Sequence, residues 1–145
     1  MVRIILGAIA GFIAWSMIWV GSEKVLSAIW PEWYGANQVA FEAAVQNGGA
    51  FTADTTILLM NIVRGSIVSV ISGFLAALIA GENRRSPLIL VVLLVAFGLV
   101  IVVMSWSYVP LWYHISFTLL LIPMTMVGGN FKKLSQEVEE GNRRE

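Results

Sequence analysis

Three long apolar runs dominate the pattern of this chain, and short polar segments separate them. Residues 4–22 carry no charged side chain, and residues 86–131 carry none either. Residues 55–81 form a third run, in which Arg64 is the only charged side chain. About twenty consecutive apolar residues are enough to cross a bilayer as an α-helix. The pattern therefore predicts a membrane protein built from apolar helices.

The last run is long enough for two membrane spans, provided that the chain turns within it. Residues 105–110, SWSYVP, supply such a turn, because aromatic residues are favoured at a membrane interface and proline is favoured at a helix start. We therefore predict an all-α, four-helix transmembrane bundle within residues 1–130, with successive helices antiparallel. The predicted spans are about residues 4–29, 56–80, 87–106 and 111–129.

The first apolar run also resembles the hydrophobic region of a secretory signal peptide. Residues 20–22, Val-Gly-Ser, would then form the cleavage site. The run is long for such a region, however, and it carries Trp15 and Trp19. We therefore interpret it as a retained transmembrane helix.

The segment between the first two spans, about residues 31–54, is the only sizeable loop in this prediction. Its charged side chains, Glu32, Glu42 and Asp54, are all acidic. Within it, NQVAFEAAVQNGG at 37–49 combines a capping asparagine, helix-forming residues and a terminal glycine pair. We predict a short helix at the outer surface of the membrane. This helix either connects the spans or acts as a lid over a pocket.

Basic residues predict the orientation of the bundle. Seven Lys and Arg lie near span ends on one side, and Lys24 alone lies on the other. The positive-inside rule makes the basic side cytoplasmic, so both termini are predicted to be cytoplasmic. Residues 131–145 would then form a polar cytoplasmic tail with a frayed end, whose Lys132 and Lys133 contact anionic head groups. The basic residues of this side are Arg3, Arg84, Arg85, Lys132, Lys133, Arg143 and Arg144.

Small residues predict where the helices meet. In a membrane, helices associate by close packing at small side chains and by polar contacts, since lipid is as apolar as leucine. Gly7 and Gly11 form a GxxxG motif in the first span. The second span carries Gly65, Ser69 and Gly73 at every fourth position, which places them on one face. We predict that these two faces pack together within the chain. The alternative is that they mediate a homodimer.

Four polar residues are predicted to meet in the outer half of the bundle. A charge at the centre of a bilayer costs about 2.5 to 3.5 kcal/mol on insertion scales, so Arg64 should face the bundle and seek a partner. Glu23 lies at a similar depth, about 10 Å from the outer end of the first span. We predict a Glu23–Arg64 ion pair whose remaining hydrogen-bonding groups are satisfied by Asn61 and His114. This layer either holds the helices in register or forms a binding site.

Composition and charge exclude several classes of function. The chain is 58% hydrophobic and 12% charged, and its formal net charge is zero, so nucleic acid is not an expected partner. It has no cysteine and a single histidine, so neither a metal site nor a cofactor is expected. The sequence also lacks GxSxG, HExxH, P-loop and GxGxxG motifs, and we therefore do not predict an enzyme.

The last apolar run, VPLWYHISFTLLLIPMTMVGGNF, has an ordered set of features. Proline and aromatic residues begin it, an apolar-proline pair lies midway, and a glycine pair precedes the basic end. The first run, GFIAWSMIWVGSEKVLSAIWP, places Glu23 ahead of Pro31. In these features the chain resembles small bacterial four-helix membrane proteins of uncharacterised function. The resemblance implies a multi-pass protein of the bacterial inner (cytoplasmic) membrane, without implying an activity. His114 stands where this pattern has an apolar or aromatic residue.

These observations favour a non-enzymatic structural or accessory subunit. Its partners would be the lipid bilayer and either a second copy of the chain or a larger membrane complex. The alternative is a small transporter or proton-coupled channel that uses Glu23, Arg64 and His114. An enzyme acting on lipid or quinone is a third class, for which a catalytic set is missing. A wet cavity opening outward over Arg64 would favour transport or ligand binding, while a dry, fully paired layer would favour a structural role.

Overall fold

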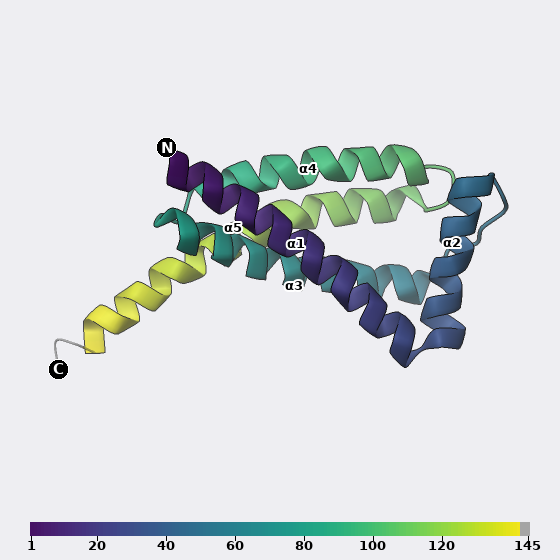
Figure 1. The fold of residues 1–145 in the computed structure, drawn as a ribbon, viewed down its shortest axis with the longest axis horizontal. Coiled ribbons are helices and arrows are strands. Elements are labelled where there is room, and N and C mark those ends of the chain that lie inside the picture. The colour runs from purple at the N-terminus through teal and green to yellow at the C-terminus, as the bar shows by residue number, and fades with distance from the viewer. Residues whose placement is uncertain (143–145) are drawn as a thin grey trace.

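Every regular element that the structure describes is helical. The computed structural model describes residues 1–142, including the side chains of residues 1–132 and of Glu137. In chain order the elements are α1 (Val2–Ile29), the π-helical turn η1 (Pro31–Gly35), α2 (Ala36–Asn47), α3 (Thr55–Ala80), α4 (Arg85–Ser105) and α5 (Leu111–Asn142) (Figure 1).

Four of the helices are long and apolar enough to cross a membrane. They are α1, α3, α4 and the Leu111–Lys132 part of α5. Helix α3 packs against both α1 and α5, and α4 packs against the same two neighbours. In Figure 1, α2 stands across one end of this bundle. The prediction of an all-helical fold with four membrane-length apolar helices is confirmed, and these helices indicate a multi-pass membrane protein.

The connection between α1 and α3 is helical over a longer stretch than the sequence analysis predicted. Helical structure begins at Pro31, directly after α1, and not at the predicted Asn37 cap. Proline favours this start, because its missing N–H would have no partner at the first position of a helix in any case. Gly48 ends α2 in the left-handed conformation with φ 70°, as the glycine stop predicted. The predicted short helix is therefore a two-part helical arm, η1 followed by α2.

Glycines allow α1 to lie directly against α3. A Cβ atom at Gly7 would lie 2.5 Å from the carbonyl oxygen of Ala76, and one at Gly11 would lie 2.9 Å from the Cβ of Ala76. One turn further along α1, Trp15 donates its indole Nε1–H to the hydroxyl of Ser69 at 3.1 Å. The GxxxG face of α1 thus packs against α3 within the chain. Glycine is required at these positions, because a larger side chain would not fit.

Helices α3 and α5 also approach each other through glycines, which the sequence analysis did not predict. A Cβ atom at Gly73 would overlap the carbonyl group of Thr125, and one at Gly128 would overlap the carbonyl group of Val70. Gly65 contacts the ring of Phe117 on α5. The small-residue face of α3 was expected to serve the first span. It borders both neighbours instead, because α3 lies between α1 and α5.

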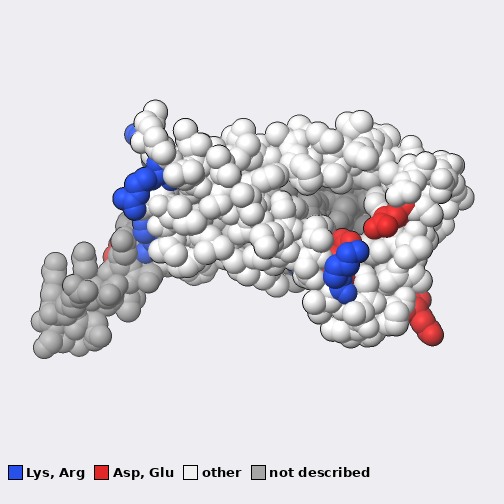
Figure 2. Space-filling model, viewed as in Figure 1, with Lys and Arg blue, Asp and Glu red and all other residues white. Residues whose placement is uncertain are grey.

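Charged side chains satisfy helix ends at the basic end of the bundle, where Lys and Arg gather in Figure 2. The carboxylate of Glu82 accepts the backbone N–H groups of residues 84–86 and so caps the start of α4. Lys132 is buried, and its Nζ donates to the carbonyl oxygen of Ala77 at 3.2 Å, near the C-terminal end of α3. Lys132 therefore contacts protein, and not a lipid head group as predicted. The side chain of Lys133 lies outside the described residues.

The predicted polar tail, residues 131–145, begins as a continuation of α5. The helix extends to Asn142 without interruption. The predicted fraying at the chain end falls largely on residues 143–145, including Arg143 and Arg144, which lie outside the described residues.

Asp54 caps the start of α3 and ties this helix to the helical arm. Its carboxylate accepts the backbone N–H groups of Thr56 at 2.8 Å and Ile57 at 3.3 Å, and the indole N–H of Trp33 at 3.1 Å. The Trp33 indole, and after it the backbone N–H of Ile57, lowers the pKa of the Asp54 carboxyl below its ordinary value.

We expect the protein to lose stability as the pH falls through the lowered pKa of Asp54. A carboxyl whose pKa is depressed by folding contributes stability above its unfolded-state pKa, and this contribution is lost when the folded state is protonated. Thermal unfolding in detergent from about pH 6 to about pH 3, a range that brackets the ordinary Asp pKa, measures the effect.

Asp54→Asn keeps a capping oxygen but removes the titrating group, so its melting temperature should vary less with pH than that of the wild type. Glu32→Gln changes an exposed acid of the same segment and serves as the control. Equal pH dependence in the wild type and Asp54→Asn would contradict the expectation.

Candidate functional site

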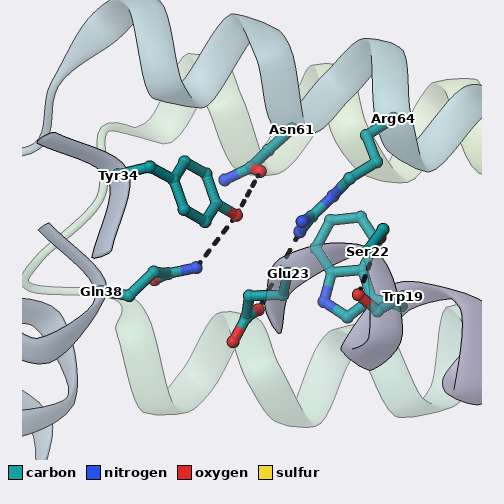
Figure 3. Close-up of polar contacts among 7 residues, drawn as sticks. All are labelled: Trp19, Ser22, Glu23, Tyr34, Gln38, Asn61 and Arg64. Carbon is teal, nitrogen blue, oxygen red and sulfur yellow. Dashed lines mark hydrogen bonds and ion pairs between the residues drawn. The ribbon is translucent and has the colours of Figure 1, made fainter. Parts of the chain in front are cut away.

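Arg64 points from α3 into the space between α1 and the helical arm (Figure 3). It lies nine residues inside α3, about 14 Å along the helix, and its side chain is only 9% exposed. A guanidinium at such a depth requires compensating contacts, because burial removes its hydration. The residues that surround it come from four elements: Trp19 and Glu23 from α1, Tyr34 from η1, Gln38 from α2 and Asn61 from α3.

The structure brings Glu23 and Arg64 together. Their closest charged atoms, Oε2 of Glu23 and Nη2 of Arg64, are 3.9 Å apart, and the Glu23 side chain is 22% exposed. This distance permits an ion pair but is too long for a hydrogen bond. The guanidinium also lies over the indole of Trp19, with Cζ 3.9 Å from the ring centroid, and more distantly over the ring of Tyr34 at 5.9 Å. A charge and two π faces therefore hold the arginine.

The guanidinium keeps most of its hydrogen-bonding capacity unused. Its Nε, Nη1 and Nη2 atoms are buried, and none makes a hydrogen bond of ordinary length and angle to a described residue; the interaction with the Tyr34 hydroxyl is only a weak one. Buried polar groups are almost always hydrogen-bonded, and an unpaired charged donor costs more than a neutral one. The guanidinium therefore retains donors that the described part of the chain does not pair.

Asn61 pairs with Tyr34 and not with Arg64. The Tyr34 hydroxyl donates to Oδ1 of Asn61 at 3.2 Å and accepts from Nε2 of Gln38 at 3.2 Å (Figure 3). Tyr34 is fully buried. Burial raises the pKa of the Tyr34 hydroxyl, so it stays protonated and remains a donor. This hydrogen-bond chain fixes the helical arm over the site.

Sequence reasoning missed Tyr34 and Gln38 as members of this site. Tyr34 lies outside the surface helix predicted at 37–49, and Gln38 lies within it as a residue without an assigned role. The available signal was Pro31, because a proline directly after an apolar helix favours a new helix start. That start brings residues 34 and 38 back over the end of α3.

The structure does not bring His114 to the Glu23–Arg64 pair. Its ring stacks on Trp106 with a centroid distance of 6.0 Å and an interplanar angle of 3°. It is buried, and its Nε2 atom has no hydrogen-bond partner in the described part of the chain. The prediction that His114 would satisfy Arg64 or Glu23 therefore finds no contact to support it. Within the same part of the chain, His, Asp and Glu form no cluster of three that could hold a metal ion.

Two clefts adjoin the site, and Figure 2 shows the molecule hollowed in this region, with acidic and basic side chains at the rim. The carboxylate cleft, about 580 Å³, lies between α1 and the helical arm and is lined by Glu23, Lys24, Ser27, Gln38 and Glu42, among others. The lateral cleft, about 260 Å³, lies between α1, α4 and α5; its lining includes Trp19 and His114. Glu23 therefore stands between the buried guanidinium and an open cleft.

Comparison with known protein families, curated proteins and solved structures finds no match to this chain.

Proposed function

We propose that this chain is a protein of the bacterial inner membrane, with both termini in the cytoplasm and the helical arm at the outer surface. The basic side chains at one end of the bundle support this orientation through the positive-inside rule. The exposed rings of Trp30 and Trp33 at the opposite end fit a membrane interface. The ordered features of the first and last apolar runs support kinship with small bacterial four-helix membrane proteins.

Within this placement, the protein is a non-enzymatic binding protein of the transporter class, and Arg64 binds the acidic group of a small solute. The observation that carries this proposal is the buried guanidinium whose three nitrogens lack hydrogen-bond partners among the described residues. A layer that served only to hold helices in register would be expected to pair these donors, since unpaired buried donors are destabilising.

Glu23 acts as the counter-ion that an incoming anion replaces. It lies 3.9 Å from Arg64, too far for a hydrogen bond, and lines the carboxylate cleft. A carboxylate or phosphate that enters from this cleft can accept two parallel hydrogen bonds from a guanidinium. Protonation of Glu23 as it leaves Arg64 keeps the net charge of the site unchanged and so couples anion entry to a proton.

The structural or accessory role has weaker support. Helix α4 exposes many large apolar side chains, including Val92, Leu99 and Val103. A lipid-facing helix needs the same composition as a helix that contacts a second copy or a larger complex. The exposed face of α4 therefore does not favour a protein partner over lipid, whereas the unpaired donors of Arg64 favour a ligand.

We expect the wild-type protein to retain a small acidic molecule that depends on Arg64. Native mass spectrometry of protein released from detergent measures this as a defined added mass. Arg64→Gln removes the charge and the guanidinium fork, so the added mass should be lost. Arg84→Gln, which changes an exposed arginine at the start of α4, should retain it.

Two results would contradict the proposal. One is a wild-type spectrum without any bound acidic molecule at low collision energy. The other is an added mass that remains at equal occupancy in Arg64→Gln. Far-ultraviolet circular dichroism and size-exclusion chromatography establish that both variants are folded before their spectra are compared.

A further inference from the structure

The lateral cleft exists because α1 diverges from α4 along the bundle. Near the basic end the two helices touch, with Gly11 against Leu90 and the ring of Phe12 5.7 Å from that of Phe97. Further along, α1 leans away towards the helical arm (Figure 1). Gly98 widens the gap, because a Cβ atom there would meet no described atom within 4 Å. The result is a cleft of about 260 Å³ inside the apolar part of the bundle.

The walls of the lateral cleft are mostly apolar, and their hydroxyl and imidazole side chains are Ser16, Ser105, Tyr113, His114 and Thr118. Trp15, Trp19, Phe117 and Leu121 form much of the surface. The hydroxyls of Ser16 and Ser105 donate to the carbonyl oxygens of Phe12 and Ile101 in their own helices, at 3.0 and 2.7 Å. Among the described side chains that line the cleft, Nε2 of His114 is the buried polar atom without a hydrogen-bond partner.

The shape of the cleft is elongated, and His114 lies at one end of it. On α5 the lining runs from Tyr113 to Leu121, eight residues or about 12 Å of helix. His114 is only three residues from the start of α5, so its Nε2 lies near the membrane interface, while Leu121 lies deep in the apolar span. A polar solute would lose its hydration throughout this length. A hydrocarbon chain has no hydration to lose, since it enters the cleft from the lipid.

We propose that the lateral cleft binds one acyl chain of a lipid, with an oxygen of the lipid's polar end hydrogen-bonded to Nε2 of His114. The chain extends along α5 from His114 towards Leu121, over the cleft wall that the contacting rings of Trp19 and Phe117 form. This site goes beyond the proposed anion site, since it involves neither Arg64 nor Glu23. It assigns a ligand contact to Nε2 of His114, an atom that the Glu23–Arg64 pair does not reach.

The test uses photo-crosslinking in phosphatidylcholine nanodiscs with a fatty acid that carries a diazirine in mid-chain. Mass spectrometry of peptides should locate the label on cleft-lining segments of α4 and α5. Gly98→Phe places an aromatic ring on the cleft wall, at a position where a Cβ atom meets no described atom within 4 Å. Labelling of these segments should fall by about tenfold, equivalent to about 1.4 kcal/mol of binding. Gly21→Phe is the matched control, because Gly21 is also free of atoms within 4 Å and lies outside the cleft.

His114→Leu separates the hydrogen bond from the shape of the cleft. It should weaken labelling by the diazirine fatty acid but not by a diazirine alkane of equal length. Gly98→Phe should leave the Arg64-dependent added mass in native mass spectra unchanged, since Gly98 does not line the carboxylate cleft, so failure of the anion site and failure of this site are distinguishable. Three outcomes would overturn the inference: labelling unaffected by Gly98→Phe, equal loss in Gly21→Phe, or displacement of the probe by a short-chain quinone but not by unlabelled fatty acid.

Discussion

Gly128→Ala is expected to destabilise the protein by about 3 kcal/mol, at the upper end of the effects seen when an extra methyl group is forced into a packed interior. The Cβ of alanine would overlap the carbonyl group of Val70, which belongs to the backbone of α3. A backbone carbonyl cannot move aside as a flexible side chain can, so α3 and α5 must separate. Unfolding of purified protein by dodecyl sulfate titration in mixed micelles measures the change in unfolding free energy.

A matched control distinguishes close approach from helix propensity. Gly98→Ala replaces a glycine that has no described atom within 4 Å of the new Cβ. It should leave stability unchanged or raise it by up to about 1 kcal/mol, because alanine is the better helix former. Gly73→Ala, which meets the carbonyl of Thr125, should resemble Gly128→Ala. Since both substitutions act on the α3–α5 contact, the double variant should lose less unfolding free energy than the sum of the losses of the two single variants. Stability equal to the wild type in Gly128→Ala would refute the packing described above.

Glu23→Ala is expected to lower the unfolding free energy by about 3 kcal/mol, because it leaves a buried guanidinium without a counter-charge. Arg64→Ala should cost a similar amount, since it also removes the contact with Trp19. The double variant should lose at least about 1 kcal/mol less than the sum of the single variants, which is the signature of a direct interaction. The same titration in mixed micelles completes this double-mutant cycle.

Lys24 supplies the comparison cycle. It is adjacent to Glu23 in the chain but exposed. The effects of Lys24→Ala and Arg64→Ala should therefore add within error. Additive losses for Glu23 and Arg64 as well would mean that their proximity contributes nothing to stability, and the charged pair would no longer define a site.

The charged pair could be anticipated from the sequence because the bilayer makes its absence expensive. The buried charge of Arg64 requires a partner of opposite charge, and Glu23 is the acidic residue at a matching depth in the neighbouring span. The same reasoning failed for His114. A neutral imidazole can be buried against an aromatic ring, and Trp106 supplies that ring. The depth of a polar residue along a helix therefore restricts its partners without deciding which way it faces.

The helical arm and the α3–α5 contact could not be predicted from the sequence. Tyr34 reaches Asn61 because the chain turns back at Pro31, and this turn depends on how α1 and α3 are tilted. Gly73 was recognised as a packing residue, but its partner Thr125 could not be chosen. A narrow face of small residues fits any helix that lies against it, so these residues do not specify which helix is the neighbour.

What the sequence determined by itself is the set of apolar helices that can span a membrane, because hydrophobicity and the pattern of charged residues act through composition alone. Only the tertiary structure decided that α3 lies between α1 and α5, that Arg64 retains unpaired donors and that His114 faces a separate cleft. These features depend on tilt and rotation of whole helices. Tilt and rotation arise from the sum of many contacts, each too weak and too distant in sequence to be read from one residue.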